Sequence, residues 1–241
     1  MIYQDRFYRN FSNTSRWKNF RVKVETTDLY IKASDDFSSY AKGIVQTLRN
    51  EIKTHIKRQK VFATALEPVY RYKNIPLVIK KMYRASEASG VGPMAGVAGA
   101  VAESVGEALL DKSSEVIVEN GGDIYIKIQE PAVVSIFAGK SLLSEKIGLK
   151  IYPDDTPAGV CTSSGTVGHS LSFGKADAAT VISNDVSLAD AVATGAANRV
   201  SSSNDFDAAI EYAMSVKSVS GIILVFKDKI AAKGNIELCS P

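Results

Sequence analysis

An aspartate and a threonine one helical turn apart are the residues of this sequence best placed to bind a metal ion. Asp190 and Thr194 lie in the run Ser-Leu-Ala-Asp-Ala-Val-Ala-Thr-Gly-Ala-Ala, whose small residues predict a helix. Residues four apart project from one face of a helix, so the carboxylate and the hydroxyl could share a hard cation such as Mg²⁺. Ser187-x-x-Asp190 also fits a capping box, in which Asp190 bonds the first amide of its own helix. Spacing alone favours the cap and leaves the metal site open.

His169 is one of two histidines and lies in a loop rich in glycine and hydroxyl residues. A histidine in a polar loop is suited to proton transfer or ligand binding, because its pKa is close to neutral. A surface histidine without a role is the alternative. Cys161 stands at the end of a predicted strand with nothing nearby to lower its pKa, which favours a buried thiol over a nucleophile.

Two glycine-rich turns precede this region. Asn120-Gly121-Gly122-Asp123 separates two apolar runs within residues 114–128 and predicts a hairpin turn. A turn at residues 90–93 opens a helix of Ala, Gly and Val that extends to residue 110. Its small residues allow either close packing on other backbone or close approach of a ligand to the helix N-terminus. The two interpretations are compatible.

The remaining pattern predicts the elements that must position these residues. Alternating apolar and polar residues in 17–33 predict a hairpin. A long helix capped by Asp35 or Asp36 is predicted by an apolar residue at every fourth position: Tyr40, Ile44, Leu48, Ile52 and Ile56. His55 is expected at the surface or boundary of this helix. Helices are also predicted at 77–89 and 204–215, and strands at 133–138, 144–152, 178–183, 221–226, 229–232 and 236–238. Paired strands with helices between them indicate an α+β fold, and the order of elements recurs loosely before and after residue 110.

Composition limits the class of protein. The chain has 241 residues, two cysteines and no apolar run of the roughly 20 residues that span a bilayer. With a polar, basic N-terminus, this predicts a cytoplasmic protein without membrane contact. Residues 1–84 carry 18 Lys and Arg against 7 Asp and Glu, and the rest 11 against 19. Because the basic residues are scattered over predicted strands and helices, we expect a solvated basic face rather than nucleic-acid binding.

The central stretch resembles the ApbE-like proteins, flavin transferases that split FAD and attach FMN to a protein Thr or Ser. Their order of motifs is a Ser-Gly pair, a histidine in a Gly-containing loop, a strand, and an Ala-Asp-Ala-x-x-Thr helix. This chain has Ser164-Gly165, His169, Gly174, the strand around Val181, and residues 189–194. Upstream, the family's small-residue helix and Gly-Gly turn resemble residues 94–99 and Gly121-Gly122-Asp123. The resemblance covers residues 90–200.

The resemblance implies a site and a fold. It assigns Mg²⁺ to Asp190, Thr194 and the carbonyl of Ala95, and catalysis to His169. It assigns the flavin nucleotide, FAD, to the remaining motif residues: Gly121, Gly122, Asp123, Ser164, Gly165 and Gly174. The implied fold is one domain of two intertwined T-fold-like halves, about 1–110 and 111–241, each an antiparallel sheet packed with helices. A protein acceptor and a homo-oligomer are also compatible with it.

Three departures from the family pattern keep the function open. The family continues His-x-x-Asp-Pro-x-Thr-Gly, whereas this chain reads His169-Ser-Leu-Ser-Phe-Gly; Ala98 replaces a lysine; and no export signal or lipid-attachment cysteine is present. The chain therefore resembles the short cytoplasmic branch. Three functions remain: transfer of FMN to a hydroxyl with release of AMP, flavin or nucleotide binding without transfer, and a role in sulfur and homocysteine metabolism in which Cys161 matters more.

Overall fold

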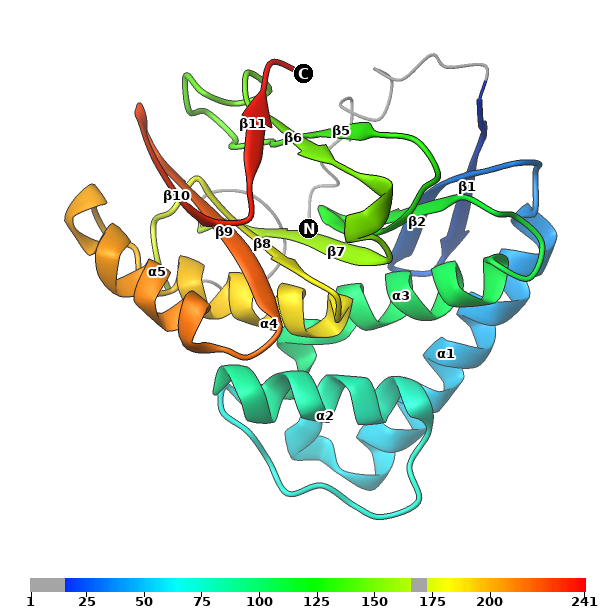
Figure 1. Ribbon diagram of the computed structural model, residues 1–241. Coiled ribbons are helices and arrows are strands. Elements are labelled where there is room, and N and C mark those ends of the chain that lie inside the picture. The colour runs from blue at the N-terminus through cyan, green and yellow to red at the C-terminus, as the bar shows by residue number, and fades with distance from the viewer. Residues whose placement is uncertain (1–15, 166–172) are drawn as a thin grey trace.

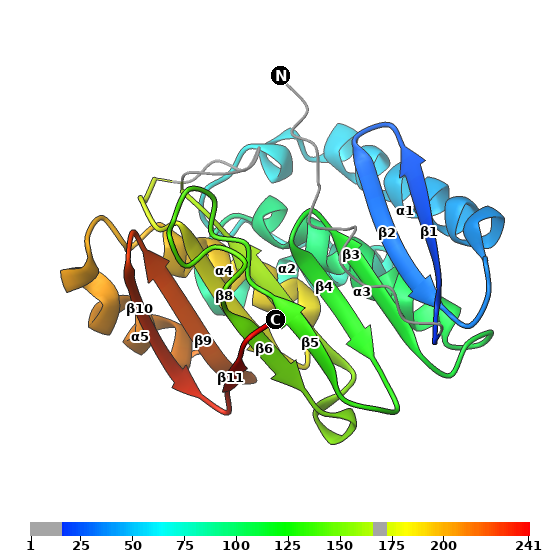
Figure 2. The same ribbon diagram turned by 90° about the horizontal axis from the view of Figure 1, so that it is seen from above.

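One antiparallel sheet of eight strands crosses the whole molecule in the computed structural model, which describes residues 16–165 and 173–241. Each strand pairs with its neighbour in an order that follows the chain, as Figure 2 shows from above. From one edge to the other the strands are β1 (Lys18–Val24), β2 (Thr27–Ala33), β3 (Val116–Asn120), β4 (Asp123–Lys127), β7 (Ala158–Ser163), β8 (Ala178–Ser183), β9 (Val219–Phe226) and β10 (Lys229–Gly234).

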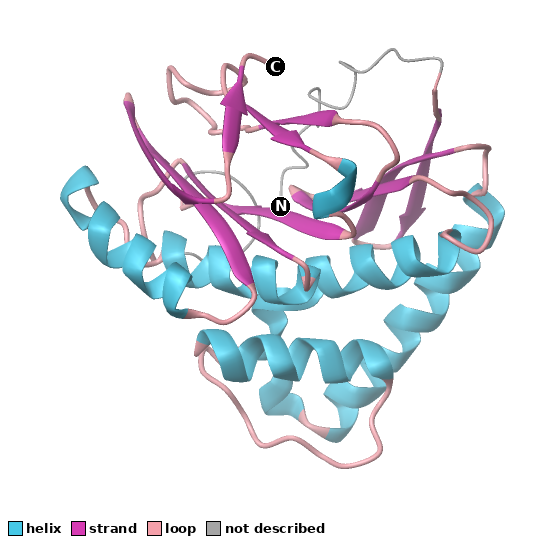
Figure 3. Cartoon of the chain, in the orientation of Figure 1, coloured by secondary structure: helices cyan, strands magenta, loops and turns pink. Residues whose placement is uncertain are grey.

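Helices cover one face of this sheet and a small second sheet covers part of the other (Figures 1 and 3). The helices are α1 (Ser38–Arg58), α2 (Leu77–Ser89), α3 (Val97–Leu109), α4 (Val186–Ala197) and α5 (Phe206–Ser215). The second sheet contains β5 (Ala132–Ser135), β6 (Gly148–Ile151) and β11 (Glu237–Cys239), in the order β11-β6-β5. Among the described residues, none of the helices has the length and apolar character needed to cross a membrane.

The layers produce two apolar cores. One lies between the large sheet and the helices, and the other lies between the two sheets. Every residue of β8 is buried because both of its faces are covered, as expected for a strand in the interior of a layered fold. On β4, Tyr125 belongs to the first core and Ile126 to the second, so successive side chains serve opposite faces. The predicted α+β class is confirmed.

The order of two strands, helices and two strands occurs twice along the chain. β1 and β2 are followed by α1 to α3 and then β3 and β4; β7 and β8 are followed by α4, α5, β9 and β10. All eight strands nevertheless belong to one sheet. The division into halves at residue 110 stays a prediction.

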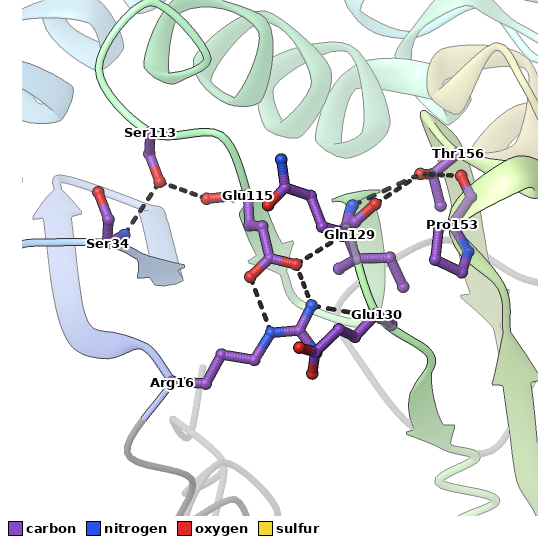
Figure 4. Close-up of polar contacts among 9 residues, drawn as sticks. Arg16, Ser34, Ser113, Glu115, Gln129, Glu130, Pro153 and Thr156 are labelled. Carbon is purple, nitrogen blue, oxygen red and sulfur yellow. Dashed lines mark hydrogen bonds and ion pairs between the residues drawn. The ribbon is translucent and has the colours of Figure 1, made fainter.

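A carboxylate outside the helical layer fastens the start of β1 to the β3–β4 hairpin (Figure 4). Glu115, just before β3, accepts hydrogen bonds from both Nε and Nη2 of Arg16 and from the backbone amide of Gln129. The guanidinium and the amide lower the pKa of Glu115 although its burial raises it. Ser113 accepts a bond from the amide of Ser34, after β2, at 2.9 Å. These contacts fix strands that begin far apart in sequence.

The interior face of α1 differs from the predicted one. The buried residues are Ala41, Val45, Leu48, Ile52 and His55. A helix turns every 3.6 residues, so a stripe of strict four-residue spacing moves away from the core, and Tyr40 at its start is exposed. The surface or boundary assignment of His55 was wrong: the side chain is 4% exposed and packs against Phe62 and Tyr83.

Candidate functional site

Asp190 of α4 caps the N-terminus of a different helix, α3. Its Oδ2 accepts a hydrogen bond from the amide of Gly99 at 2.8 Å, and the amide of Ala98 also acts on the carboxylate. These amides belong to the first turn of α3, whose N–H groups have no partners within the helix. A carboxylate at this position also interacts favourably with the helix dipole. Figure 1 shows α3 and α4 one after the other beneath the sheet, meeting near its middle.

Small residues allow the two helices to approach this closely. A Cβ on Gly99 would lie 2.4 Å from the carbonyl oxygen of Val186 and 2.9 Å from the Cβ of Asp190. Real Cβ atoms essentially never show such separations, so an alanine here would push α3 and α4 apart. One turn earlier, the Ser187 hydroxyl donates to the carbonyl of Gly96 at 3.0 Å. The small-residue helix predicted from sequence therefore packs closely on its neighbour.

The predicted capping box of α4 is wrong, although Asp190 does cap a helix. The N-cap of α4 is Asp185, whose side chain accepts a hydrogen bond from the amide of Leu188 at 2.9 Å. Asp190 therefore lies in the second turn of α4, where its own amide is already bonded within the helix. Its carboxylate is free to point away toward α3. Spacing along the sequence could not show this, because the partner amide is 91 residues away.

Burial makes the charge of Asp190 costly. The residue is 8% exposed and forms no ion pair with a described residue. Burial raises the pKa of Asp190 from 3.8 to about 7, although the two backbone amides lower it. Removing water from a carboxylate without supplying a cation disfavours its ionised form. A bound cation would offset this cost.

The β3–β4 turn lies against the same end of α3. Gly121 and Gly122 have φ values of 72° and 109°, a conformation that side-chain-bearing residues rarely adopt. The amide of Gly122 donates to the Glu119 side chain at 3.0 Å, and its carbonyl accepts from the amide of Thr162 on β7 at 3.2 Å. Asn120 donates through Nδ2 to the carbonyl of Ala98 at 3.0 Å. The Gly-Gly turn is thus fastened to both α3 and β7.

Cys161 lies close enough to two carboxylates, those of Asp123 and Asp190, for both charges to act on its thiol. It is paired with Asp123 across β4 and β7 and is fully buried. Burial, followed by the charges of Asp123 and Asp190, raises the pKa of the Cys161 thiol well above its ordinary value. The thiol donates a weak bond to the carbonyl of Val186 at 3.5 Å. The predicted buried thiol is confirmed, and it stays protonated at neutral pH.

The chain leaves the site after β7 through Ser164 and Gly165 and returns through Gly174. Gly165 and Gly174 are in contact, since a Cβ on Gly165 would lie 2.2 Å from the Gly174 carbonyl oxygen. The amide of Gly165 bonds the carbonyl of Ala176 at 2.9 Å. These glycines close the base of the intervening segment, and their contact with a ligand stays a prediction. His169 lies in that segment, outside the described residues.

The proposed metal donors are of the kind that Mg²⁺ uses. Asp190 and Thr194 share a face of α4, and Ala95 lies in the 3₁₀ turn Pro93–Gly96 that leads into α3. Within residues 16–165 and 173–241, no three His, Cys, Asp or Glu side chains gather as a metal cage. Mg²⁺ is usually held by one or two carboxylates, with water and substrate phosphate completing its shell. One buried carboxylate, a hydroxyl and a carbonyl suit that mode better than a closed all-protein site.

Sequence reasoning missed Asn120 as a positioning residue. The Asn-Gly-Gly-Asp run was interpreted only as a turn, whereas its asparagine ties the turn to α3. The residue type itself indicates that further bonds are possible, because an asparagine side chain carries two donors and an acceptor. Its partner is 22 residues away, so the contact could not be located before the helix was placed.

Solved structures define the class of this fold. The chain is similar to the apo form of the flavinyl transferase ApbE of Pseudomonas stutzeri, with a TM-score of 0.60 and 11% identity. The similarity covers 90% of this chain and 94% of the other. The chain is also similar to the ApbE protein of Thermotoga maritima, with a TM-score of 0.54 and 13% identity over 90% and 96% of the two chains. At these identities the likeness concerns the fold, which is that of the ApbE proteins.

Sequence comparisons then place the chain more narrowly. The sequence model of the family described as AbpE bacteria matches residues 9–222. A UPF0280 protein of Methanocella arvoryzae is 38% identical over 91% of this chain and 89% of its own length. A UPF0280 protein of Methanopyrus kandleri is 43% identical over 81% and 79%. The chain belongs to the ApbE-like family, among the UPF0280 proteins.

Proposed function

We propose that this protein binds FAD together with Mg²⁺ and transfers FMN to a Thr or Ser hydroxyl of an acceptor protein, with release of AMP. The observation that carries the proposal is the buried Asp190 carboxylate held at the N-terminus of α3. It lies beside the Gly121–Gly122 turn and the end of β7, in a chain with the fold of the flavin transferases named above.

The electrostatics of this place suit a diphosphate. The first turn of α3 directs backbone N–H groups and the positive end of the helix dipole toward the site. Asp190 already accepts a bond from one of these N–H groups, that of Gly99. Its negative charge would repel a phosphate group bound without a cation. Mg²⁺, when bound, would neutralise this charge together with that of the phosphates and polarise the bond to be broken. Asp190, Thr194 and the Ala95 carbonyl would hold it.

The reaction is a phosphoryl-type displacement within the FAD diphosphate. The acceptor hydroxyl oxygen forms a bond to the phosphorus on the FMN side, the bridging P–O bond breaks, and AMP leaves with the electron pair. The hydroxyl proton must pass to a base. His169 is the residue that the family resemblance offers for this role, and a neutral imidazole at physiological pH has a suitable pKa.

The environment of Cys161 supports transfer to oxygen over thiol chemistry. A thiol that is fully buried, with a raised pKa and two neighbouring carboxylates, is a weak nucleophile. The role in sulfur metabolism would need an accessible or deprotonated Cys161. This observation favours a hydroxyl acceptor.

The test is incubation of the purified protein with FAD, Mg²⁺ and a soluble extract of the source organism as the supply of acceptor. Transfer is measured as flavin fluorescence that stays with a protein band after denaturation, and AMP is measured by chromatography. We expect both signals with the wild type and neither with Asp190→Asn. Asp185→Asn is the matched control, because asparagine is an equally good N-cap of the same helix.

The other functions give different results. Binding of FAD without AMP or a fluorescent band would indicate a flavin-binding protein without transfer. If Cys161→Ala abolished the role of the protein in cells while flavin transfer in the assay stayed normal, this would indicate sulfur chemistry. Equal activity of Asp190→Asn and wild type would refute the assignment of the metal donors.

A further inference from the structure

Residues 53–84, from the last turns of α1 through the following segment into α2, are rich in basic residues. Residues 53–84 contain nine Lys and Arg against one acidic residue, Glu67. Four of these basic side chains contact an acidic or aromatic side chain: Lys53, Arg58, Arg71 and Lys81. The other five are exposed or at the outer surface and form no ion pair within the described part of the chain: Lys57, Lys60, Lys73, Lys80 and Arg84.

Large apolar side chains are exposed in the same stretch of chain. Ten such side chains occur among the described residues, and four of them fall between residues 61 and 77. They are Val61 at 50%, Leu66 at 55%, Tyr70 at 74% and Leu77 at 59% exposed. Together with the five unpaired basic residues they form what we call the basic strip: Lys57, Lys60, Val61, Leu66, Tyr70, Lys73, Leu77, Lys80 and Arg84. Single exposed apolar residues are ordinary, whereas a group of them indicates an interaction surface.

The strip centres on residues 64–76, a segment without helix or strand that runs along the outer side of α2 (Figure 1). Loops of this length inside a domain are uncommon unless they serve a function or are disordered. The segment is fixed in place. Val69 and Ile75 pack on the main core, and Arg71 reaches Glu87 of α2 at 3.5 Å.

A buried polar network holds the backbone at the most exposed aromatic residue. The carbonyl of Tyr70 accepts from Gln59 Nε2 at 2.9 Å and lies 3.2 Å from the Tyr83 hydroxyl. That hydroxyl is also 2.5 Å from Gln59 Oε1 and 3.0 Å from His55 Nε2. The Tyr70 backbone is therefore held from inside, while its ring is 74% exposed and lies edge to face with the Tyr72 ring at 5.6 Å. Binding to an ordered backbone costs less conformational entropy than binding to a mobile one.

The segment 64–76 passes close to the candidate flavin site. The carbonyl of Ala65 packs so closely on Gly92 that a Cβ there would lie 1.8 Å from the oxygen. Gly92 directly precedes the turn Pro93–Gly96, which carries the proposed metal donor Ala95. A macromolecule bound along the strip would thus lie beside the site.

We propose that the basic strip is the docking surface for an acidic, partly apolar segment of the acceptor protein, which rests on the proposed FMN transfer. Tyr70 is its main anchor, since tyrosine is among the residues that carry most of the binding energy at interfaces, and Leu66 adds exposed apolar area beside it in the chain. The unpaired lysines and Arg84 attract the acidic partner and orient it.

The chemistry of the strip favours a protein over RNA or a membrane. RNA bases are recognised by stacking on aromatic faces, whereas three of the four exposed apolar residues are aliphatic and the nearby Tyr72 ring is covered by Arg58 at 4.5 Å. Surface binding to membranes uses a helix with a continuous apolar face. Here Tyr70 and Leu66 stand on a segment that contains no helix.

The test places a photo-crosslinking p-benzoylphenylalanine at position 70 of the full chain in the same soluble extract. The control places it at Ile230, an apolar residue on the edge strand β10 that is 40% exposed. We expect an adduct with an acidic protein at position 70 and not at 230. An adduct that nuclease or lipid extraction removes, equal adducts at both positions, or no adduct at position 70 would each overturn the proposal.

Direct binding of the crosslinked protein, purified, then decides whether the strip is responsible. We expect Tyr70→Ala, and separately Lys73→Glu with Lys80→Glu, to weaken its binding about tenfold. Raising the salt concentration should also weaken it. FAD binding should be unchanged in the same variants, which shows that they fold and that the flavin site is intact. Binding that resists both sets of substitutions would refute the proposal.

The outcome also separates this proposal from the proposed function. A partner that docks on the strip but never becomes flavinylated would contradict FMN transfer and leave the docking surface in place. Flavinylation of an acceptor at the wild-type rate by the Tyr70→Ala and charge-reversed variants would contradict the docking surface and leave the transfer in place.

Discussion

The substitution Asp190→Asn should stabilise this protein while it removes the proposed metal donor. Asparagine keeps a carbonyl oxygen that can accept the bond from the Gly99 amide, so the change removes charge and little else. The pKa of Asp190 is 3.8 when exposed and about 7 in the folded chain. Since one pKa unit corresponds to about 1.4 kcal/mol, ionised Asp190 costs the folded state up to about 4 kcal/mol.

The sign of the pH dependence follows from the raised pKa. The folded state holds the proton of Asp190 more tightly than the unfolded state, so the contribution of Asp190 to stability is greatest below pH 3.8 and falls as pH rises toward 7. In the variant this loss is absent. The stability gap in favour of Asp190→Asn should therefore be about 1–2 kcal/mol at pH 5 and about 4 kcal/mol or somewhat less at pH 8.

Urea denaturation at the two pH values, with EDTA present, measures this gap. FAD with Mg²⁺ in place of EDTA should then stabilise the wild type at pH 8 more than the variant, because a ligand stabilises a protein in proportion to its affinity for the folded state. A variant less stable than wild type at pH 8 in EDTA, or a gap that is the same at both pH values, would refute the electrostatic reasoning.

Three further results are expected. Gly99→Ala should lower the free energy of unfolding, measured by urea denaturation, by about 1–3 kcal/mol, because its Cβ would overlap the neighbouring helix. Gly43→Ala is the control: nothing lies within 4 Å of that position, so the change should be neutral or stabilising by up to about 1 kcal/mol. Tyr83→Phe should lower the free energy of unfolding by about 1–3 kcal/mol, because it leaves the buried Gln59 side chain and the Tyr70 carbonyl without the hydroxyl. It should also speed amide hydrogen exchange in residues 64–76. Cys161 should resist iodoacetamide at pH 8 in the native protein and react after denaturation, as mass spectrometry can follow; rapid native labelling would contradict its burial.

Local patterns predicted much of the fold. The alternation in residues 17–33 and the Asn-Gly-Gly-Asp turn specify hairpins through neighbouring residues alone, and both are present as β1–β2 and β3–β4. The strands predicted at 133–138 and 144–152 are shorter, at Ala132–Ser135 and Gly148–Ile151. Their separate sheet depends on pairing with β11 at the far end of the chain, which no local pattern reports.

The site depends on contacts that spacing cannot reveal. Ser187-x-x-Asp190 has the pattern of a cap, but the amide that Asp190 bonds belongs to α3. His55 interrupts an apolar stripe and was assigned to the surface, whereas Tyr83 and Phe62 from other elements enclose it. In both cases a polar side chain is buried because a distant segment supplies its partner. The family resemblance, which carries such information, placed Asp190 and Gly121–Gly122 in one site.

Titration of the purified protein with FAD, followed by quenching of flavin fluorescence, tests the central claim most directly. The wild type should bind FAD in Mg²⁺ and lose most of its affinity in EDTA or below pH 7, as Asp190 takes up a proton. Asp190→Asn should show the weaker affinity in every condition, and Asp185→Asn should match the wild type. FAD binding that is absent in the wild type, or that is independent of both Mg²⁺ and Asp190, would contradict the assignment of this site.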